Sequence, residues 1–234
     1  MVPPAITDPA SAPAEDSGAT RVLLFPLNVV GVPPPSEVEA GAGAVAAELR
    51  AYLEEHGVAV EALEPDPART EWLEAARAYR AEVREEQASL EGAAGVLALR
   101  LREGHDFDLL LLPWILMRAA RLKDGVVAWD GVRRKVDFFP LGNTKRYRWV
   151  LGRVQLWVKV PSLQALGVSA EGEKVFEGAG GLDLVDEAEL DLSASKVHLE
   201  MVPKDRIFDD RAHLREGIAI ALEAFLPRTG ARAE

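Results

Sequence analysis

Apolar residues at the start of the chain form one short run, then a helical repeat, then a second run. The run Arg21–Leu27 (RVLLFPL) is typical of a buried strand. A Pro-rich break follows, and the next apolar residues recur at helical spacing from Ser36, the expected cap, to about His56, with Gly57 as the stop. Val58–Leu63 is a second expected strand. This order predicts a parallel βαβ unit with a right-handed crossover.

A second helical region follows the βαβ unit. Asp66 is expected to cap a helix, with Pro67 at its first position. Gly92 and Gly95 are expected to loosen the chain before another apolar helix, Val96–Leu101. The pattern therefore predicts two helices separated by a glycine-containing linker.

In the second half of the chain, apolar and polar residues alternate, which indicates half-buried antiparallel strands. The four leucines Leu109–Leu112 predict a central strand, with Pro113 at a bulge or at its end. The expected strands after it are Ile115–Leu122, Val126–Trp129, Val132–Phe139, Arg148–Val160 ended by Pro161, Leu163–Val168 and Lys174–Gly178. Gly178–Gly181 (GAGG) is interpreted as a bulge or turn, and residues 183–204 fit no single element. A last amphipathic helix is expected from Asp209 or Asp210 to Phe225.

These elements predict an α/β fold with α+β character. We expect a single domain with a mixed sheet, in which an N-terminal βαβ unit is followed by an antiparallel meander and a C-terminal helix. Residues 1–20 are rich in Pro, Ala, Ser and Asp and are expected to be a disordered tether. The domain is expected to span 21–227, and 228–234 to be a flexible tail. No apolar run approaches the roughly 18 residues of a membrane-spanning helix.

Composition excludes several kinds of chemistry. The 234 residues include no cysteine, which rules out disulfides, Cys-ligated zinc and thiol catalysis within this chain. The formal net charge of −11 argues against a general nucleic-acid binder, so no nucleic-acid partner is expected.

That net charge is unevenly distributed. Residues 118–159 carry 11 basic and 3 acidic side chains, a net charge of +8 inside an otherwise acidic protein. Strand alternation predicts that Arg133 and Lys135 face solvent while Val136 and Phe138 face the core. In 149–159 the odd-numbered positions share one face, and the apolar even-numbered positions share the other.

Tryptophan and arginine are favoured anchors at protein interfaces, so this block is the candidate partner-binding surface. Its candidate residues are Arg133, Lys135, Arg146, Arg148, Trp149, Arg153 and Trp157. The alternative is structural: the tryptophans pack beneath a helix, and the basic groups pair with acidic helices of the same chain.

Motifs for catalysis or metal binding are missing. The four histidines, His56, His105, His198 and His213, form no close ligand pair, and no serine stands in a G-x-S-x-G elbow. We therefore expect no enzyme, no catalytic residues, no metal and no cofactor. An alternative keeps a small-ligand or enzymatic pocket at the carboxyl ends of the strands, around Asn28, His105, Asp108 and Trp114.

Three segments carry a resemblance to a known group. RVLLFPLNVVG with the following helix EAGAGAVAAELRAYLEEHG, then HDFDLLLLPWIL, then GVSAEGEKVFEGAGG resemble the TolB N-terminal, CsgG and LpoB-like α/β group of bacterial envelope proteins. The resemblance covers roughly residues 21–225. It implies a periplasmic, outer-membrane-associated lipoprotein domain that binds other envelope proteins and is not catalytic. The chain departs from the group in lacking a lipidation cysteine and in the length of the region 66–104.

The functional hypothesis is therefore a non-catalytic envelope binding or assembly module. Its expected partner is an envelope protein or a second copy of the chain, with membrane association through a lipid anchor outside this chain. The alternatives are a cytoplasmic interaction subunit that holds an acidic partner, and the ligand-binding or enzymatic domain described above.

Overall fold

The N-terminal part of the chain forms the predicted βαβ unit. A computed structural model describes residues 19–136, 138–139, 156–191, 198–203 and 207–226. Strands β1 (Arg21–Leu24) and β2 (Ala59–Ala62) pair in parallel and are joined by α1 (Ser36–Glu55). On its other edge β1 pairs in parallel with the start of β3 (Leu109–Lys123). Gly57 ends the α1 region at a positive φ of 77°, a conformation that glycine adopts without strain.

One long strand pair runs through the molecule. Strand β3 has 15 residues and β7 (Leu156–Ser169) has 14, and they pair antiparallel from Leu109↔Ser169 to Leu122↔Leu156. The opposite edge of β3 is shared by β1 at its start and β4 (Val126–Trp129) at its end. Strands β5 (Val132–Lys135) and β8 (Lys174–Gly181) pair with β4 and β7 and complete a seven-stranded sheet.

Pro113 and Pro161 lie inside these long strands, which corrects the prediction that each would end a strand or mark a bulge. The carbonyl of Pro113 accepts a hydrogen bond from Asn28 N at 3.3 Å, just past the end of β1. The carbonyl of Pro161 accepts from Leu182 N at 3.1 Å, just past the end of β8. The N–H and C=O of one strand residue point to the same side, and the carbonyl groups of both prolines point away from the β3–β7 pairing. The N–H group that proline lacks would point the same way, so no hydrogen bond between β3 and β7 is lost.

The expected strand Val132–Phe139 is divided between two sheets. Its first half is β5, whereas β6 (Phe138–Phe139) pairs in parallel with β9 (Asp186–Asp191). Strand β9 also pairs antiparallel with β10 (His198–Pro203), which gives a three-stranded second sheet. The ambiguous region 183–204 therefore holds two strands, and the second half of the chain is more branched than a simple meander.

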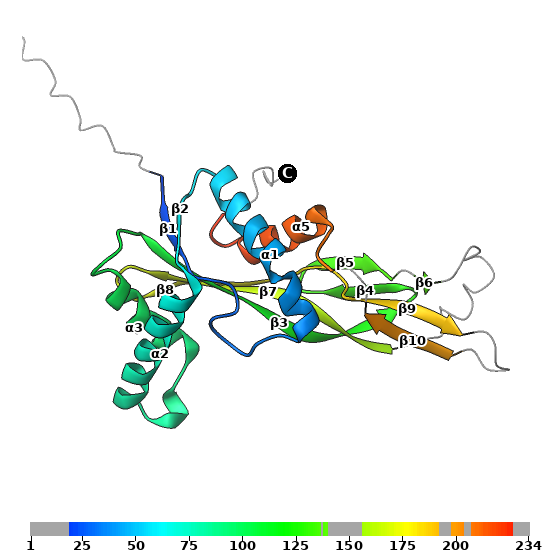
Figure 1. The fold of residues 1–234 in the computed structure, drawn as a ribbon, viewed down its shortest axis with the longest axis horizontal. Coiled ribbons are helices and arrows are strands. Elements are labelled where there is room, and N and C mark those ends of the chain that lie inside the picture. Colours follow the sequence, from blue (N-terminus) through cyan, green and yellow to red (C-terminus); the bar gives the residue numbers. More distant parts are fainter. Residues whose placement is uncertain (1–18, 137, 140–155, 192–197, 204–206, 227–234) are drawn as a thin grey trace, which may run out of the picture.

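Helices cover both faces of the seven-stranded sheet (Figure 1). Helices α1 and α5 (Arg211–Ala221) lie on one face, and α2 (Pro65–Glu82) and α3 (Leu90–Leu101) lie on the other. The short 3-10 helix Glu85–Gln87 joins α2 to α3. Strand alternation separates the two cores, because Leu109 and Leu111 pack beneath α1 while Leu110 and Leu112 pack against α2 and α3.

The helix starts differ from the predictions. Neither Ser36 nor Asp66 acts as a cap, since α1 begins at Ser36 after Pro35, and α2 begins one residue before Asp66 without a side-chain cap. Helix α3 begins at Leu90, capped by the Ser89 hydroxyl, so Gly92 and Gly95 lie inside it. A β-carbon on Gly92 would overlap the Tyr79 ring, and one on Gly95 would lie 2.6 Å from the Gly172 carbonyl oxygen. These glycines permit close packing on neighbouring elements, and they do not interrupt the helix.

Helix α5 packs directly on the backbone of β8. A β-carbon on Gly178 would overlap the carbonyl oxygen of Ala221, and one on Gly180 would overlap that of Gly217. The GAGG segment is thus regular strand, which corrects its interpretation as a bulge or turn. The absence of a side chain at Gly178 and Gly180 sets the helix-to-sheet distance. Within the described residues, no helix is both long enough and apolar enough to cross a bilayer.

This packing predicts opposite effects for two glycine-to-alanine changes. Gly180→Ala should lower the free energy of unfolding by about 1–3 kcal/mol, because the added methyl group must displace α5. Gly43→Ala, in α1 where a β-carbon has no neighbour within 4 Å, should raise it by about 0.5–1 kcal/mol through helix propensity. Urea unfolding monitored by circular dichroism measures both. Equal effects of the two changes would contradict this account of α5 packing.

Asp210 caps α5 and should make its stability depend on pH. Its carboxylate accepts hydrogen bonds from His213 N and Ala212 N, and the His213 bond is the main cause that lowers the Asp210 pKa. The contribution of the Asp210 cap to the free energy of unfolding is therefore complete above the ordinary Asp pKa. It is lost as the pH falls through the lowered pKa of Asp210. Asp210→Ala should cost about 1 kcal/mol at pH 7 and less at pH 3, measured by urea unfolding at both pH values. Asp210→Asn retains a side-chain acceptor, so it should lower the free energy of unfolding at pH 7 by less than Asp210→Ala does.

Candidate binding surface

Burial alternates strictly along the strands that extend beyond the helices. In β5, Val132 and Arg134 are buried while Arg133 and Lys135 are exposed. The same alternation holds at the far ends of β3, β4 and β7, where Ala120, Val127 and Val158 belong to one buried cluster. One side of this region is therefore a core and the other is solvent-facing, as the alternation of the sequence predicts.

We call the solvent-facing side the distal outer face. Its residues are Ala119, Arg121, Lys123, Ala128, Arg133, Lys135, Trp157 and Lys159. The strand register makes them neighbours: Trp157 lies opposite Arg121, Lys159 opposite Ala119, and Arg133 opposite Ala128. Val126, half-buried, lies between Lys123 and Lys135. Arg121, Lys123 and Lys159 thus surround Trp157 on the outer side of β3 and β7. Arg133 and Lys135 lie on the outer side of the β4–β5 hairpin, which folds over the opposite side of β3 and β7 and so faces another direction.

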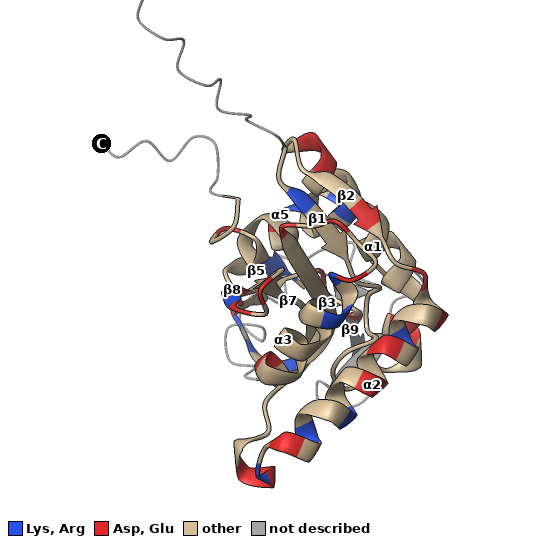
Figure 2. Cartoon of the chain, turned by 90° about the vertical axis from the view of Figure 1, so that its left-hand side faces the viewer, with Lys and Arg blue, Asp and Glu red and all other residues tan. Residues whose placement is uncertain are grey.

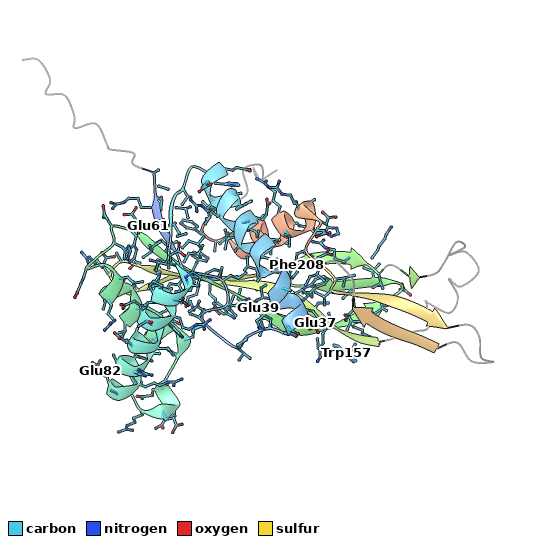
Figure 3. All side chains as sticks on the ribbon, viewed as in Figure 1. Glu37, Glu39, Glu61, Glu82, Trp157 and Phe208 are labelled. Atoms are coloured by element: carbon cyan, nitrogen blue, oxygen red, sulfur yellow. The ribbon has the colours of Figure 1, made fainter. Side chains whose placement is uncertain are left out.

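Trp157 is the large apolar group of this face. Its relative exposure is 73%, although most tryptophans in folded proteins are largely covered. Figure 3 shows it below the strands, on the side of the sheet away from α5. In the described part of the chain, the other exposed large apolar residues, Val32, Leu73, Leu99 and Val175, lie on other elements.

The cations of the face differ from most basic residues elsewhere on the protein. Lys123, Arg133, Lys135 and Lys159 have no side-chain carboxylate partner among the described residues, and Arg121 has an interaction of its own. Like charges on neighbouring positions of a sheet repel one another. The cluster therefore carries an electrostatic cost that a bound anion would relieve.

Several basic residues at the helical end of the molecule are paired with carboxylates. Arg100 of α3 bonds Glu71 and Glu74 of α2, and acidic and basic positions are interspersed along α2 (Figure 2). Arg21 bonds Asp108 at 3.0 Å, and this hydrogen bond is the main cause that lowers the pKa of the Asp108 carboxyl. Arg69, Arg77 and Arg80 of α2 have no carboxylate bond among the described residues. They alternate with the acidic residues Asp66, Glu71, Glu74 and Glu82 of the same helix, so positive charge at this end is offset within α2.

Arg134 has a structural role although it is adjacent to Arg133. Its side chain is 4% exposed and bonds Glu216 at 2.6 Å, with the carbonyl oxygens of Leu182 and His213 at 3.1 and 3.2 Å. These bonds attach β5 to α5 and to the segment after β8. The Gly181 N–H also bonds the Asp130 carbonyl at 3.1 Å, so the β4–β5 hairpin curls back onto the end of β8.

The sequence also allowed a structural interpretation, in which the tryptophans pack beneath a helix and the basic residues pair with acidic residues of the same chain. This interpretation holds for some of the residues only. Trp129 is buried and donates to the Pro161 carbonyl at 3.1 Å, and Arg134 pairs with α5 as that alternative requires. Trp157, Arg133 and Lys135 are exposed, which is the arrangement the binding hypothesis requires, and their role in binding stays a prediction. The remaining candidates, Arg146, Arg148, Trp149 and Arg153, lie outside the described residues.

The residues of the expected ligand pocket come together only in part. Trp114 lies beside the loop of Asn28, since a β-carbon on Gly31 would be 3.1 Å from the Trp114 ring. Asn28 lies at the carboxyl end of β1, where its Oδ1 accepts from Ile115 N at 2.8 Å. His105 and Asp108 lie at the opposite end, before β3, and His105 Nδ1 is 2.7 Å from Glu61 Oε1. The cavity beside the carboxyl ends of β1 and β2 is lined mainly by apolar side chains of β1, α1 and the residues around Pro65. The proposed grouping of Asn28 with His105 and Asp108 is therefore wrong.

Two of the other histidines, His56 and His213, have local partners. His56 Nδ1 lies 2.7 Å from the Tyr52 carbonyl oxygen, and His213 Nδ1 lies 3.1 Å from Asp183 Oδ1. His198 begins β10. No group of three or more His, Asp or Glu side chains within the described ranges is arranged to hold a metal ion.

Comparison with protein-family models gave no match, and comparison with curated protein sequences gave none either. Among solved structures, the chain is similar to a Helicobacter pylori structure described as a candidate neuraminyllactose-binding hemagglutinin homolog. The TM-score is 0.32 at 11% identity, over 86% of this chain and 80% of the other. A likeness of this size fixes no ligand, so the functional argument depends on this chain's own residues. Membership of the TolB N-terminal, CsgG and LpoB-like group stays a prediction.

The adjacent arginines of β5 should respond differently to the same change. Arg134→Gln should lower the free energy of unfolding by about 2–3 kcal/mol, because it removes a charged donor and leaves buried carbonyl groups without partners. Arg133→Gln should change it by less than about 0.5 kcal/mol, as for an exposed surface position. Thermal or urea unfolding distinguishes them. A large loss for Arg133→Gln would show that the outer face is structural.

Proposed function

We propose that this protein is a non-catalytic binding or assembly module of the bacterial envelope, and that the distal outer face is its contact surface. The observation that carries the proposal is the 73% exposure of Trp157 on a strand pair that also presents the exposed side chains of Lys123 and Lys159. A tryptophan left in water forgoes a large burial energy, which contact with a partner would recover.

The position of the face supports this function. It lies on the part of the β3–β7 pair that extends past the helices, so a partner can reach it without disturbing the two helix-covered cores. The strands that present it are fixed by continuous pairing and by the Arg134 bonds to α5. A rigid surface loses little conformational entropy on binding, which favours its use as a recognition site.

The envelope location rests on the sequence resemblance of three segments, RVLLFPLNVVG among them. The alternative location is the cytoplasm, where the same face would hold an acidic partner.

Site-specific photo-cross-linking in the native organism tests the proposal. A benzophenone amino acid replaces Trp157 in the protein expressed from its full reading frame, and the same group replaces Leu73 of α2 as a matched exposed control. We expect an adduct with an envelope component at position 157 and not at position 73, identified by mass spectrometry. We also expect the protein in the envelope fraction after cell fractionation.

Two outcomes would contradict the proposal. Recovery in the cytoplasmic fraction would overturn the envelope location. The same set of adducts at both positions would mean that the distal outer face is not a specific contact surface. An adduct of twice the chain mass would identify the partner as a second copy.

A further inference from the structure

A cavity of about 510 Å³ lies at the carboxyl ends of β1 and β2, and Pro113 of β3 borders the same space. Figure 1 shows both strands ending beside α1, with α2 beginning directly after β2. The strand order β2–β1–β3 reverses at β1, because α1 lies on one face of the sheet while α2 and α3 lie on the other. Open α/β sheets bind their ligands at the carboxyl ends of the strands beside such a point. The volume is within the range of about 300–1,000 Å³ that small-molecule sites occupy.

The walls of this cavity offer a ligand few hydrogen bonds. Three of the lining residues are prolines, which have no N–H to donate, and most of the others are leucine, alanine or glycine. The N–H groups of Phe25 and Leu63 are already bonded to the carbonyl oxygens of Leu111 and Leu24, at 2.9 and 3.1 Å. A polar group buried here would lose its hydration without gaining a partner. The part of a ligand that enters the cavity is therefore apolar, and the mainly aliphatic wall favours a chain over a stacked ring.

Gly43 of α1 lines the cavity, and the packing of the chain gives no reason for a glycine there. Glycine inside a helix is destabilising relative to alanine. At Gly41 a neighbour explains it, because a β-carbon would lie 2.7 Å from the Phe208 ring, whereas at Gly43 a β-carbon would meet no atom within 4 Å. Positions that break a local rule without a compensating contact are expected at functional sites. A ligand lying against α1 would account for Gly43.

Arg50 is the charged member of the lining, all of which lies in the described part of the chain. Its side chain is about half exposed and bonds Glu54 at 2.8 Å, one turn further along α1. An exposed pair at this spacing is weak, so an incoming anion can replace Glu54. Arginine also lays its apolar stem along apolar surface while its guanidinium group stays in water. The cavity thus combines an apolar wall with one available cation.

We infer that this cavity binds an amphiphile with an aliphatic chain and an anionic head, the chain lying against Gly43 and the head bonded to Arg50. A free fatty acid and a lysophospholipid share this chemistry. The cavity contains no residue of the distal outer face, so this inference goes beyond the proposed function and does not depend on it.

Isothermal titration calorimetry of the full chain, below the critical micelle concentration of each probe, tests the inference. Dodecanoate should bind, and affinity should rise by about fourfold for each methylene group added from octanoate to dodecanoate. Dodecanol and dodecyltrimethylammonium should bind at least about tenfold more weakly than dodecanoate, because neither offers an anion to Arg50. Tighter binding of lauroyl lysophosphatidylglycerol than of dodecanoate would identify a phospholipid source, and the reverse a free fatty acid; each result supports the inference.

Substitutions in α1 locate the chain. Gly43→Leu places a side chain in the cavity and should remove detectable dodecanoate binding. The matched control is Ala44→Leu, at the next position, which is exposed and outside the lining, and it should bind like the unmodified protein. Urea unfolding checks that both variants remain folded.

Two further variants locate the head. Arg50→Gln should weaken dodecanoate binding by about tenfold and leave dodecanol binding unchanged. Glu54→Gln releases Arg50 from its partner and should strengthen dodecanoate binding. Arg77→Gln, at an exposed position of α2 outside the lining, is the control for the loss of one positive charge and should change neither affinity.

Three results would overturn the inference: no saturable binding of dodecanoate, equal losses in Gly43→Leu and Ala44→Leu, or unchanged dodecanoate affinity in Arg50→Gln. None of them affects the cross-linking expected at Trp157, so the proposed function stands or fails separately.

Discussion

The pairing of β3 with β7 is the interaction on which the rest of the structure depends. Fifteen residues of extended chain span about 50 Å, whereas the 20 residues of α1 span about 30 Å. A helix packed along such a strand cannot cover its whole length. The proximal part of the pair becomes the centre of a helix-covered sheet, and about six residues at the distal end are left without a helix on their outer side.

This difference in length explains why one side of β3 is buried at its start and exposed at its end. Leu109, Leu111 and Ile115 are buried beneath α1, yet Ala119, Arg121 and Lys123 on the same side of β3 are exposed. The residue types follow the change, from leucine and isoleucine to alanine and basic residues. The opposite side stays mainly apolar, with Arg118 bonded to Asp130 as its charged member, because the β4–β5 hairpin curls over its distal part. The basic segment is therefore where a sheet changes from interior to surface.

Sequence patterns predicted most of this arrangement, because period-two and helical spacing are local properties. The βαβ unit, the C-terminal helix and the outward position of Arg133 and Lys135 all follow from them. The predictions were wrong where contacts with residues distant in the sequence determine the local structure. Pro113 is tolerated within β3 only because β1 has already ended beside it, and Gly92 faces the ring of Tyr79 from another helix. The parallel pairing of β6 with β9 joins segments that no local pattern connects.

The adjacent arginines of β5 show why charge alone does not identify a functional residue. Arg134 points inward, where Glu216 and two backbone carbonyl groups compensate its desolvation, so its charge serves the fold. Arg133, one position earlier, points to solvent and keeps its charge available. A net charge of +8 over 118–159 therefore overstates the binding potential of the segment, since Arg134 and also Arg118, bonded to Asp130 at 2.5 Å, are already committed. The exposed cations that remain are fewer and lie on two sides, Lys123 and Lys159 beside Trp157 on β3 and β7, and Arg133 and Lys135 on the hairpin. Which cations can act together on a partner depends on the side they share, and the total charge does not report it.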